Sequence, residues 1–586
     1  MRLRVRRNPS ACLVLLITAI LGAGYAPAQA EAAPTKPYLV FSTYLGGTTA
    51  VAGGTARTFA QNVACDAQGN VYVTGGTEVT DLPGTDSAFQ SSPAPNSAMS
   101  AFVAKYDPTG TMLWCTYLGG DAHSMGTGVA AMPDGGVAVI GLTSSGPHGP
   151  FPTKNAFQPQ YHGNADYFVT VFDQDGKLRY STYLGGGLVE GTAGKVFSDN
   201  NSNGNNIAVD AAGLVYVTGT TGSGYVNATI PFPNTPNAIQ PSSLYVGEDA
   251  FMCIINPAKS GPESLVYSSI LGGTMNDKGH SIAVDTSGTY ITAGGYTRSW
   301  DFPTTDNAYR KDPPDDFDSN GYLTQVVSSL PGDPSSVYTL RYSTYLGGTK
   351  DKPRDDVYGM VMSPTGLIVA TGRTQSADFP MTDGGPSIFN SAGYLRNGVS
   401  SDEPFLVKID PSQSGKASLV YATFLGGGDA EGKWGSFCTS VGVDARGTAY
   451  VAGETYGNPG APYVPPGHPI AAPEDFPYTL NALFTTLQGG FDAVFMQIDP
   501  TGYPLNYSTF LGGSANDRTY GLAVDPTGPN VVLSGLTSSD DFPVVNAAQI
   551  WPGNTGCQNA FVAKFSLPGA TARRMGHVLE LLLLGD

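Results

Sequence analysis

Short apolar stretches recur along the chain, and each one ends in a turn sequence. A typical stretch reads apolar-Ala-Val-Asp-x-x-Gly-x-x-Tyr-Val-Thr-Gly and occurs, with small variations, at residues 207–219, 282–294 and 441–453. Runs of β-branched and aromatic residues of this length favour strands. The Asp-x-x-Gly between them supplies a side-chain acceptor and a residue that tolerates positive φ, which is typical of a tight hairpin turn. Each copy therefore predicts two antiparallel strands, called strands a and b.

A second pair of apolar phrases follows in fixed order and predicts strands c and d. Strand c reads Phe-Val-x-Lys-x-Asp or a close variant, at residues 101–107, 405–410 and 560–565. Strand d reads Tyr-Ser-Thr-Tyr-Leu-Gly-Gly and recurs seven times. Its copies span residues 41–47, 114–120, 180–186, 267–273, 342–348, 421–427 and 507–513. Seven copies of a seven-residue phrase indicate true internal repeats.

Seven four-stranded antiparallel units predict an all-β fold, a seven-bladed β-propeller. A single blade cannot bury both of its faces, and packing blades in a ring buries them. The first repeated phrase is a strand d at Phe41, and the last is a strand c at residues 561–565. We therefore expect the N-terminal strand to complete the last blade and close the ring. An open linear solenoid is the alternative.

A third phrase, Asp-Phe-Pro-x-Thr, lies between strands b and c at residues 301–305, 378–382 and 475–479. Together, the three kinds of phrase resemble those of the bacterial SBBP family of β-propeller repeats. The resemblance covers residues from about 38 to 567. It implies a propeller in an exported or surface protein, and it implies no particular chemistry, because members of that family mostly lack an assigned one.

The two ends of the chain differ from the repeats. Residues 1–30 hold four arginines, an apolar run at 11–23 and a small-x-small site at Ala28-Gln29-Ala30. This pattern is typical of a signal peptide, with a buried N-terminal helix as the alternative. We therefore expect export to the cell surface, the periplasm or the medium, a propeller over 38–567, and a short C-terminal tail over 568–586. The tail's apolar run is too short to span a membrane.

Composition supports a turn-rich fold and limits the partners. The chain has 76 Gly and 44 Pro among 586 residues, and only 13 % of its residues are charged. This excludes a coiled coil, and the 31 Tyr and 26 Phe exclude a disordered chain. Without residues 1–30, the chain carries 26 basic and 48 acidic residues, a net charge of −22. Such a surface repels phosphate backbones, so we expect no nucleic-acid partner. We expect a monomer with no transmembrane segment after cleavage.

Two d–a loops carry candidate calcium ligands. After Leu-Gly-Gly, the fourth and seventh copies continue to Asn276-Asp277 and Asn516-Asp517. Carboxylate and amide oxygens beside glycine carbonyls can bind Ca²⁺, which takes six to eight oxygens. The alternative is that these side chains cap backbone amides, as Asp in turns often does. We expect no cofactor other than this calcium.

Other reactive side chains favour scaffold roles. The repeated strand-c lysines, Lys105, Lys408 and Lys564, indicate a structural contact such as pairing with a neighbouring acid. The five cysteines beyond residue 30 show no metal-binding spacing, so we expect buried apolar residues or at most one disulfide. His123 and His280 follow strands d and could approach the propeller channel.

The longest insertions predict where the protein works. They lie in the d–a and b–c connections, which share one end of a propeller, whereas the a–b turns are short. Loops on a rigid scaffold commonly carry binding. The sequence therefore predicts a binding or scaffold protein that recognises a protein, glycan or small ligand through this end. The alternative is an extracellular hydrolase or lyase that acts on a polymer at the channel mouth. Two or three acids or histidines converging there would favour the enzyme.

Overall fold

The computed structural model is built from β-strands between Pro37 and Leu567. It describes residues 36–568 apart from 87, 147–148, 192–204, 226, 244–246, 314–317, 350–353, 377, 383–401, 427–436, 457 and 460–474. The predicted signal peptide at 1–30, and the predicted tail beyond Pro568, lie outside these residues. In the described part of the chain, no helix is long and apolar enough to cross a membrane.

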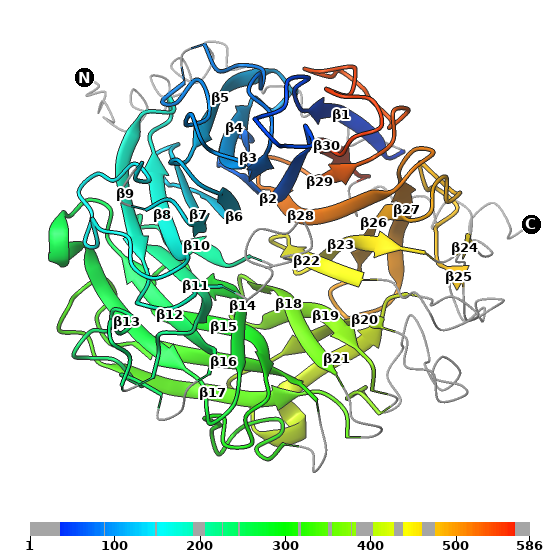
Figure 1. Cartoon of the computed structure of the whole chain (residues 1–586). Coiled ribbons are helices and arrows are strands. Elements are labelled where there is room, and N and C mark those ends of the chain that lie inside the picture. Colours follow the sequence, from blue (N-terminus) through cyan, green and yellow to red (C-terminus); the bar gives the residue numbers. More distant parts are fainter. Residues whose placement is uncertain are drawn as a thin grey trace, which may run out of the picture. The chain divides into compact units, whose positions relative to one another are not determined.

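The structure contains seven blades, I to VII, and each is a four-stranded antiparallel sheet (Figure 1). This confirms the predicted seven-bladed propeller. Blade I contains β2 (Thr58–Cys65), β3 (Val71–Thr77), β4 (Ser100–Tyr106) and β5 (Met112–Leu118). Blade II contains β6 (Ser124–Ala131), β7 (Val137–Thr143), β8 (Asp166–Phe172) and β9 (Leu178–Leu184). Blade III contains β10 (Ile207–Val209), β11 (Val215–Thr221), β12 (Asp249–Ile255) and β13 (Leu265–Leu271).

Blades IV to VII follow the same order of strands a, b, c and d. They are β14 (Asp277–Val284), β15 (Tyr290–Thr297), β16 (Asn320–Ser328), β17 (Tyr338–Leu346); β18 (Asp355–Met362), β19 (Ile368–Thr374), β20 (Glu403–Ile409), β21 (Leu419–Phe424); β22 (Phe437–Val443), β23 (Ala449–Thr455), β26 (Asp492–Ile498), β27 (Leu505–Leu511); and β28 (Asp517–Asp525), β29 (Asn530–Thr537), β30 (Asn559–Ser566), β1 (Tyr38–Leu45). Two short 3₁₀ turns, η1 (Gly261–Ser264) and η3 (Gly415–Ser418), and the parallel pair β24 (Asn458–Pro459) and β25 (Asp475–Phe476) lie between blade strands.

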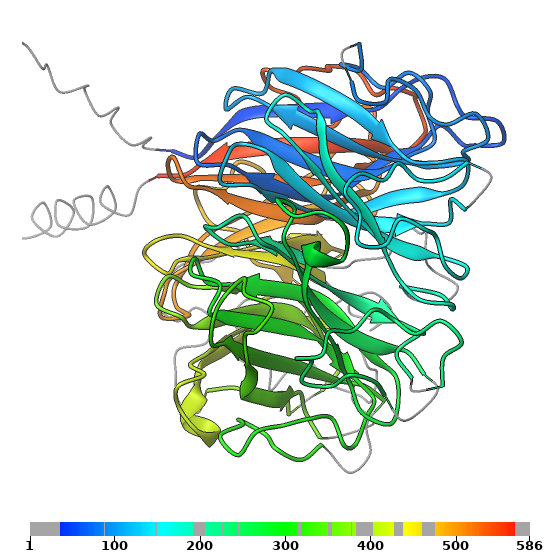
Figure 2. The ribbon, with the colours of Figure 1, turned by 90° about the vertical axis from the view of Figure 1, so that its left-hand side faces the viewer.

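The N-terminal strand closes the ring as predicted. β1 pairs antiparallel with β30, with Tyr38 opposite Ser566 and Leu45 opposite Ala560. Figures 1 and 2 show β1, in blue, beside β30, in red. Each strand a is innermost in its blade and contacts the strands a of both neighbouring blades around the propeller axis. We call the end at which strands a begin the loop-rich end.

The repeated phrases fix each outer strand to the segment that precedes strand c. In blade IV the Tyr345 hydroxyl donates to the Ser299 carbonyl at 2.8 Å and accepts the Phe302 N–H at 3.1 Å. The Ser343 hydroxyl donates to the Pro303 carbonyl at 2.5 Å. The Tyr-Ser-Thr-Tyr and Phe-Pro phrases bond to one another in the same way in blades II and VII. Blade V has Ala422 and Phe424 at these places and lacks the two hydroxyls.

These same segments shield the outer edge of the propeller. In blade IV, Thr305 N–H donates to the Ser343 carbonyl at 3.0 Å, and Tyr345 N–H donates to the Arg310 carbonyl at 3.1 Å. The b–c connections therefore lie only partly at the loop-rich end, since each continues along the open edge of its strand d. Covered edges prevent strand addition by other chains.

The repeated lysines confirm their predicted scaffold role. Lys564 Nζ lies 2.7 Å from Asp525 Oδ2 inside blade VII. Lys408 and Lys105 instead donate to carbonyls of the next blade, at Pro500 (2.7 Å) and Gln174 (3.2 Å). The cysteines beyond residue 30 all carry free thiols, so the alternative of one disulfide is not realised; they are Cys65, Cys115, Cys253, Cys438 and Cys557.

Candidate functional site

The candidate calcium ligands Asn276 and Asp277 make different contacts. Asp277 opens β14 and is fully buried, and its Oδ2 accepts the Gly273 N–H at 2.7 Å and the Ser299 hydroxyl at 2.8 Å. Asn276 Oδ1 instead accepts the N–H of Glu248 at 3.2 Å. The carboxylate therefore caps the Gly-Gly connection, and the amide caps the end of the b–c segment.

The second candidate pair repeats part of this arrangement. Asp517 opens β28 and is fully buried, and its Oδ2 accepts the Gly513 N–H and the Ser539 hydroxyl, both at 2.8 Å. The Asn516 carbonyl accepts the N–H of Ser538 at 2.8 Å. Both aspartates thus cap the turn that precedes their own strand.

A second acid lies beside each of these aspartates. Asp249 opens strand c of blade III, and its Oδ1 lies 2.4 Å from the point that a Cβ on Gly272 would occupy. Asp277 Oδ2, from blade IV, lies 2.7 Å from that same point. Burial, and then the charge of Asp277, raise the pKa of Asp249 to about 8, and burial raises the pKa of Asp277 to about 6. The bare glycine leaves room for two acids between blades.

Equivalent blade junctions hold related pairs of side chains. Asp492 and Asp517 adjoin Gly512 at the VI–VII junction, and Asn320 and Asp355 adjoin Gly347 at the IV–V junction. An Asn can therefore take the place of the strand-c acid. Sequence reasoning missed these strand-c acids, although their repeated place at the start of strand c was a usable signal.

These pairs can hold a shared proton or a cation. Carboxylates are suitable calcium ligands, but two of them supply only part of the six to eight oxygens that Ca²⁺ takes. Among the described residues, no group of three or more His, Cys, Asp or Glu side chains is arranged to hold a metal ion. Calcium at Asn276, Asp277, Asn516 and Asp517 stays a prediction.

A polar cluster lies near the axis at the loop-rich end, on blades IV and V. His280 on β14 stacks on Tyr358 with ring centroids 5.4 Å apart and meets Tyr296 edge-on at 5.5 Å. Its Nδ1 lies 3.1 Å from the Val357 carbonyl. Since a carbonyl only accepts, Nδ1 carries the proton. Burial lowers the pKa of His280 to about 4, so the ring is neutral at pH 7.

The acids beside His280 are held by basic residues. Arg373 donates to Asp356 Oδ2 through Nε at 2.8 Å and through Nη2 at 2.7 Å, and reaches Asp402 through Nη1 at 3.2 Å. Lys278 Nζ lies 3.0 Å from Glu248 Oε2. The structure thus brings His280 to the axis among acids, as the enzyme alternative requires, but these acids are ion-paired.

An apolar cluster lies on the other side of the axis. Phe59, Met99, Met125, Tyr520 and Leu536 form this buried cluster, contributed by blades I, II and VII. Ion pairs adjoin it, since Arg57 pairs with Glu78 and Arg518 pairs with Glu454. The seven inner strands therefore share a backbone pattern but carry different side chains at the loop-rich end.

Exposed apolar side chains lie at the same end. Met275 is 50 % exposed in the d–a turn between blades III and IV, and Trp300 is 56 % exposed in the b–c segment of blade IV. Their two turns are bonded together. Met275 N–H donates to the Ser299 hydroxyl at 2.8 Å, and Thr274 N–H donates to Asp301 Oδ1 at 2.8 Å. The two side chains are therefore held by neighbouring, fixed turns.

Comparison with known sequences identifies the repeat. The sequence model of the SBBP family, described as a β-propeller repeat, matches residues 40–83. Residues 40–83 are therefore similar to an SBBP repeat. This match covers one strand d, the following strands a and b, and the start of the Leu-Pro segment. No curated protein sequence matches this chain.

Several solved structures share distant similarity with this chain. Pseudomonas fluorescens PhoX in complex with vanadate is 9 % identical, with a TM-score of 0.33, over 91 % of this chain and 96 % of that one. An ACO/RPE65 chimera is 8 % identical, with a TM-score of 0.28, over 83 % and 97 %. A subtype N11 neuraminidase-like protein of a flat-faced bat virus from Peru is 9 % identical, with a TM-score of 0.25, over 91 % and 98 %. Similarity at this level says nothing about activity.

Proposed function

We propose that this chain is an exported binding protein that recognises an extracellular protein or glycan through its loop-rich end. The observation that carries the proposal is the exposed pair Met275 and Trp300, held on two turns that bond to one another. Exposed Trp and Met side chains on ordered turns are typical of recognition surfaces, where aromatic anchors supply most of the binding energy. A fixed turn also loses little conformational entropy on binding.

Further apolar side chains extend this surface toward blades II and III. Leu188 and Ile230 are 40 % and 39 % exposed, and the connection before Leu188 is bonded to Ile230 by a 2.7 Å hydrogen bond from Gly187 N–H. Like Met275 and Trp300, they pair a d–a turn with a b–c segment. A partner surface seated here would contact the loops of neighbouring blades together.

The binding surface is tested by the double variant Met275→Ala/Trp300→Ala. The purified protein is screened on a glycan array and on a panel of purified cell-surface proteins. We expect the variant to bind the captured partner at least ten-fold more weakly, since a central aromatic anchor contributes about 2 kcal/mol or more.

The matched control lies at the opposite end of the propeller. Leu330 and Val337, in the c–d turn of blade IV, are 53 % and 62 % exposed. The variant Leu330→Ala/Val337→Ala removes similar apolar area there and should bind as the wild type does. Equal loss in both variants, or no loss in the Met275/Trp300 variant, would contradict the proposal.

The enzyme alternative, a hydrolase or lyase acting on a polymer, depends on the cluster around His280. Its imidazole is neutral, but a pKa of about 4 makes it a weak base at pH 7. The neighbouring acids Asp356 and Glu248 are paired with Arg373 and Lys278. A general acid needs a proton to give, and an ion-paired carboxylate holds none. For this reason we favour binding as the function.

A further inference from the structure

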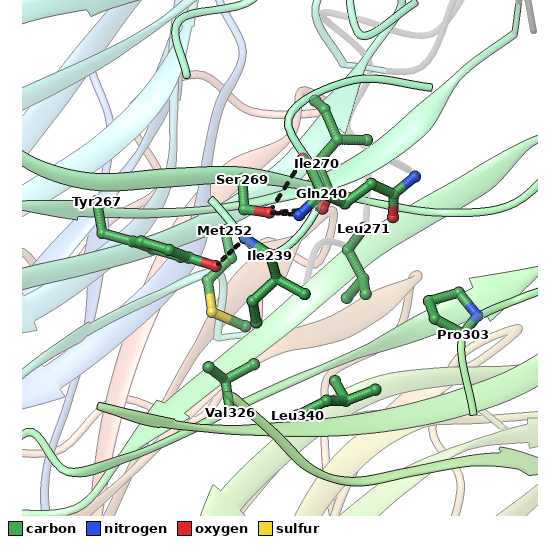
Figure 3. A pocket seen from close by; sticks show the side chains of 10 residues that line it. All are labelled: Ile239, Gln240, Met252, Tyr267, Ser269, Ile270, Leu271, Pro303, Val326 and Leu340. Carbon is green, nitrogen blue, oxygen red and sulfur yellow. Dashed lines mark hydrogen bonds between the residues drawn. The ribbon is translucent and has the colours of Figure 1, made fainter. Parts of the chain in front are cut away.

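One blade junction contains an apolar pocket at the outer rim of the propeller. It lies between blades III and IV and has a volume of about 210 Å³. Figure 3 shows Ile239 between Met252 and Leu271 of blade III, with Val326 and Leu340 of blade IV opposite. Ile239 is 39 % exposed, so the pocket is reached from solvent.

The polar groups in the pocket wall are already bonded to one another. The Tyr267 hydroxyl accepts the Ile239 N–H at 3.4 Å, and the Ser269 hydroxyl donates to the carbonyls of Gln240 at 3.1 Å and Ile270 at 2.9 Å. Figure 3 draws these bonds along the wall. The remaining lining is aliphatic, thioether or ring carbon, so the pocket offers a guest almost only apolar contact.

Comparison with other junctions explains why the pocket is open here. In blades I, II and IV, one carbonyl of the b–c segment accepts a hydrogen bond from an N–H of strand d. The residue just before that carbonyl is Phe89 in blade I, Phe157 in blade II and Tyr309 in blade IV. At the I–II junction, the Phe89 ring meets Phe172 of the next blade edge-on, with centroids 5.8 Å apart. The corresponding residues at the III–IV junction are Ile239 and Val326. Two smaller side chains therefore stand where two rings meet at the I–II junction. The residue equivalent to Ile239 is also aliphatic in blades VI and VII, at Leu483 and Ala548.

We propose that this pocket is a binding site for a small apolar molecule with a single aromatic ring. A dry cavity of about 150 Å³ lined by Leu, Ile and Phe side chains is enough to bind benzene. The III–IV pocket is larger and has the same kind of lining, so a benzene ring with one or two carbon substituents fits. This site is separate from the loop-rich end, because it lies along the outer strands.

Titration calorimetry with benzene and with pyrazine tests the site. The two rings have the same size, but pyrazine carries a nitrogen acceptor on opposite sides and would leave at least one unpaired in an apolar wall. We expect benzene to bind at least ten-fold more tightly than pyrazine. Equal affinity for the two rings, or no benzene binding up to its solubility limit, would overturn the proposal.

The variant Ile239→Phe tests the location of the site. It restores the residue type found at positions 89 and 157, so it fills the pocket with a side chain that the repeat accommodates. We expect it to lose benzene binding and to keep or raise its melting temperature. The control Leu483→Phe makes the same kind of change at the VI–VII junction and should keep wild-type benzene affinity. Unchanged benzene affinity in the Ile239→Phe variant would overturn the proposal.

Discussion

The buried acid pair Asp166 and Glu190 predicts that the protein becomes less stable as the pH rises. The two residues face each other at the junction of blades II and III, next to Gly185, and both are fully buried. Burial, and then the charge of Glu190, raise the pKa of Asp166 to about 8, against a hydrogen bond from the His162 N–H. Burial raises the pKa of Glu190 to about 7.

The sign of the effect follows from proton binding. An unfolded Asp titrates near pH 3.9. Between about pH 4 and pH 8, the folded protein therefore holds a proton on Asp166 that the unfolded chain has released. Stability is greatest below this window, falls as the pH rises through it, and levels off above pH 8. The slope for one such proton is about 1.4 kcal/mol per pH unit.

The variant Asp166→Asn removes this proton-binding group and keeps its shape. Asn320 beside Asp355 shows that the repeat accepts an amide at this position. We expect the stability of the variant relative to the wild type to rise by about 2 kcal/mol or more between pH 5 and pH 8. Urea unfolding at four pH values measures the difference. The control Asp175→Asn removes a carboxylate from an exposed turn of the same blade and should keep the wild-type pH dependence.

The reasoning fails if Asp166→Asn keeps the wild-type slope of stability against pH. It also fails if the variant is destabilised equally at pH 5 and pH 8, because that pattern would report lost packing rather than a lost proton. Other junctions contribute to the wild-type slope, so the test compares the two profiles and does not depend on the absolute slope of either.

Two further substitutions test the packing between and within blades. Gly110→Ala should lower the free energy of unfolding by about 3 kcal/mol. Gly110 has φ +97°, and an added Cβ would lie 2.5 Å from Phe41 of the neighbouring blade. Chemical denaturation measures this loss, and a loss below 1 kcal/mol would refute the contact. Lys564→Met should lower the free energy of unfolding by about 3–5 kcal/mol at pH 7, because it leaves the buried Asp525 carboxylate without its cation. The double variant Lys564→Met/Asp525→Asn should recover much of that loss in the same assay.

The fold could be predicted because the same sequence phrase recurs seven times along the chain. A single Tyr-Ser-Thr-Tyr-Leu-Gly-Gly phrase indicates only a strand and a turn. Seven copies, with strand d first at Phe41 and strand c last before Phe565, leave one economical closure of the ring. The aromatic and hydroxyl residues of the phrase also bond within blades II, IV and VII, so local and global preferences agree there.

The candidate site was harder to predict because it depends on contacts between different blades. Asp249 and Asp277 are 28 positions apart in sequence, and only the Gly-Gly connection after strand d brings them together. The strand-c position holds Ser100 in blade I and Asn320 in blade IV, so the acid does not recur as a strict motif. The partners of His280 are Tyr358 and Val357 on the next blade and Tyr296 on the neighbouring strand of its own blade, a combination that no spacing rule anticipates.

In a repeat protein, the residues that differ between equivalent positions carry the most information about function. Tyr345 and Lys564 have counterparts in other blades, and each bonds to the scaffold. Trp300 and His280 mark places where one blade departs from the others at the loop-rich end, and Ile239 does so at the outer rim. If these residues served only packing, neighbouring side chains would fill the space around them. Trp300 is instead exposed, and the space beside Ile239 is open. Binding is therefore most reasonably sought where the repetition fails.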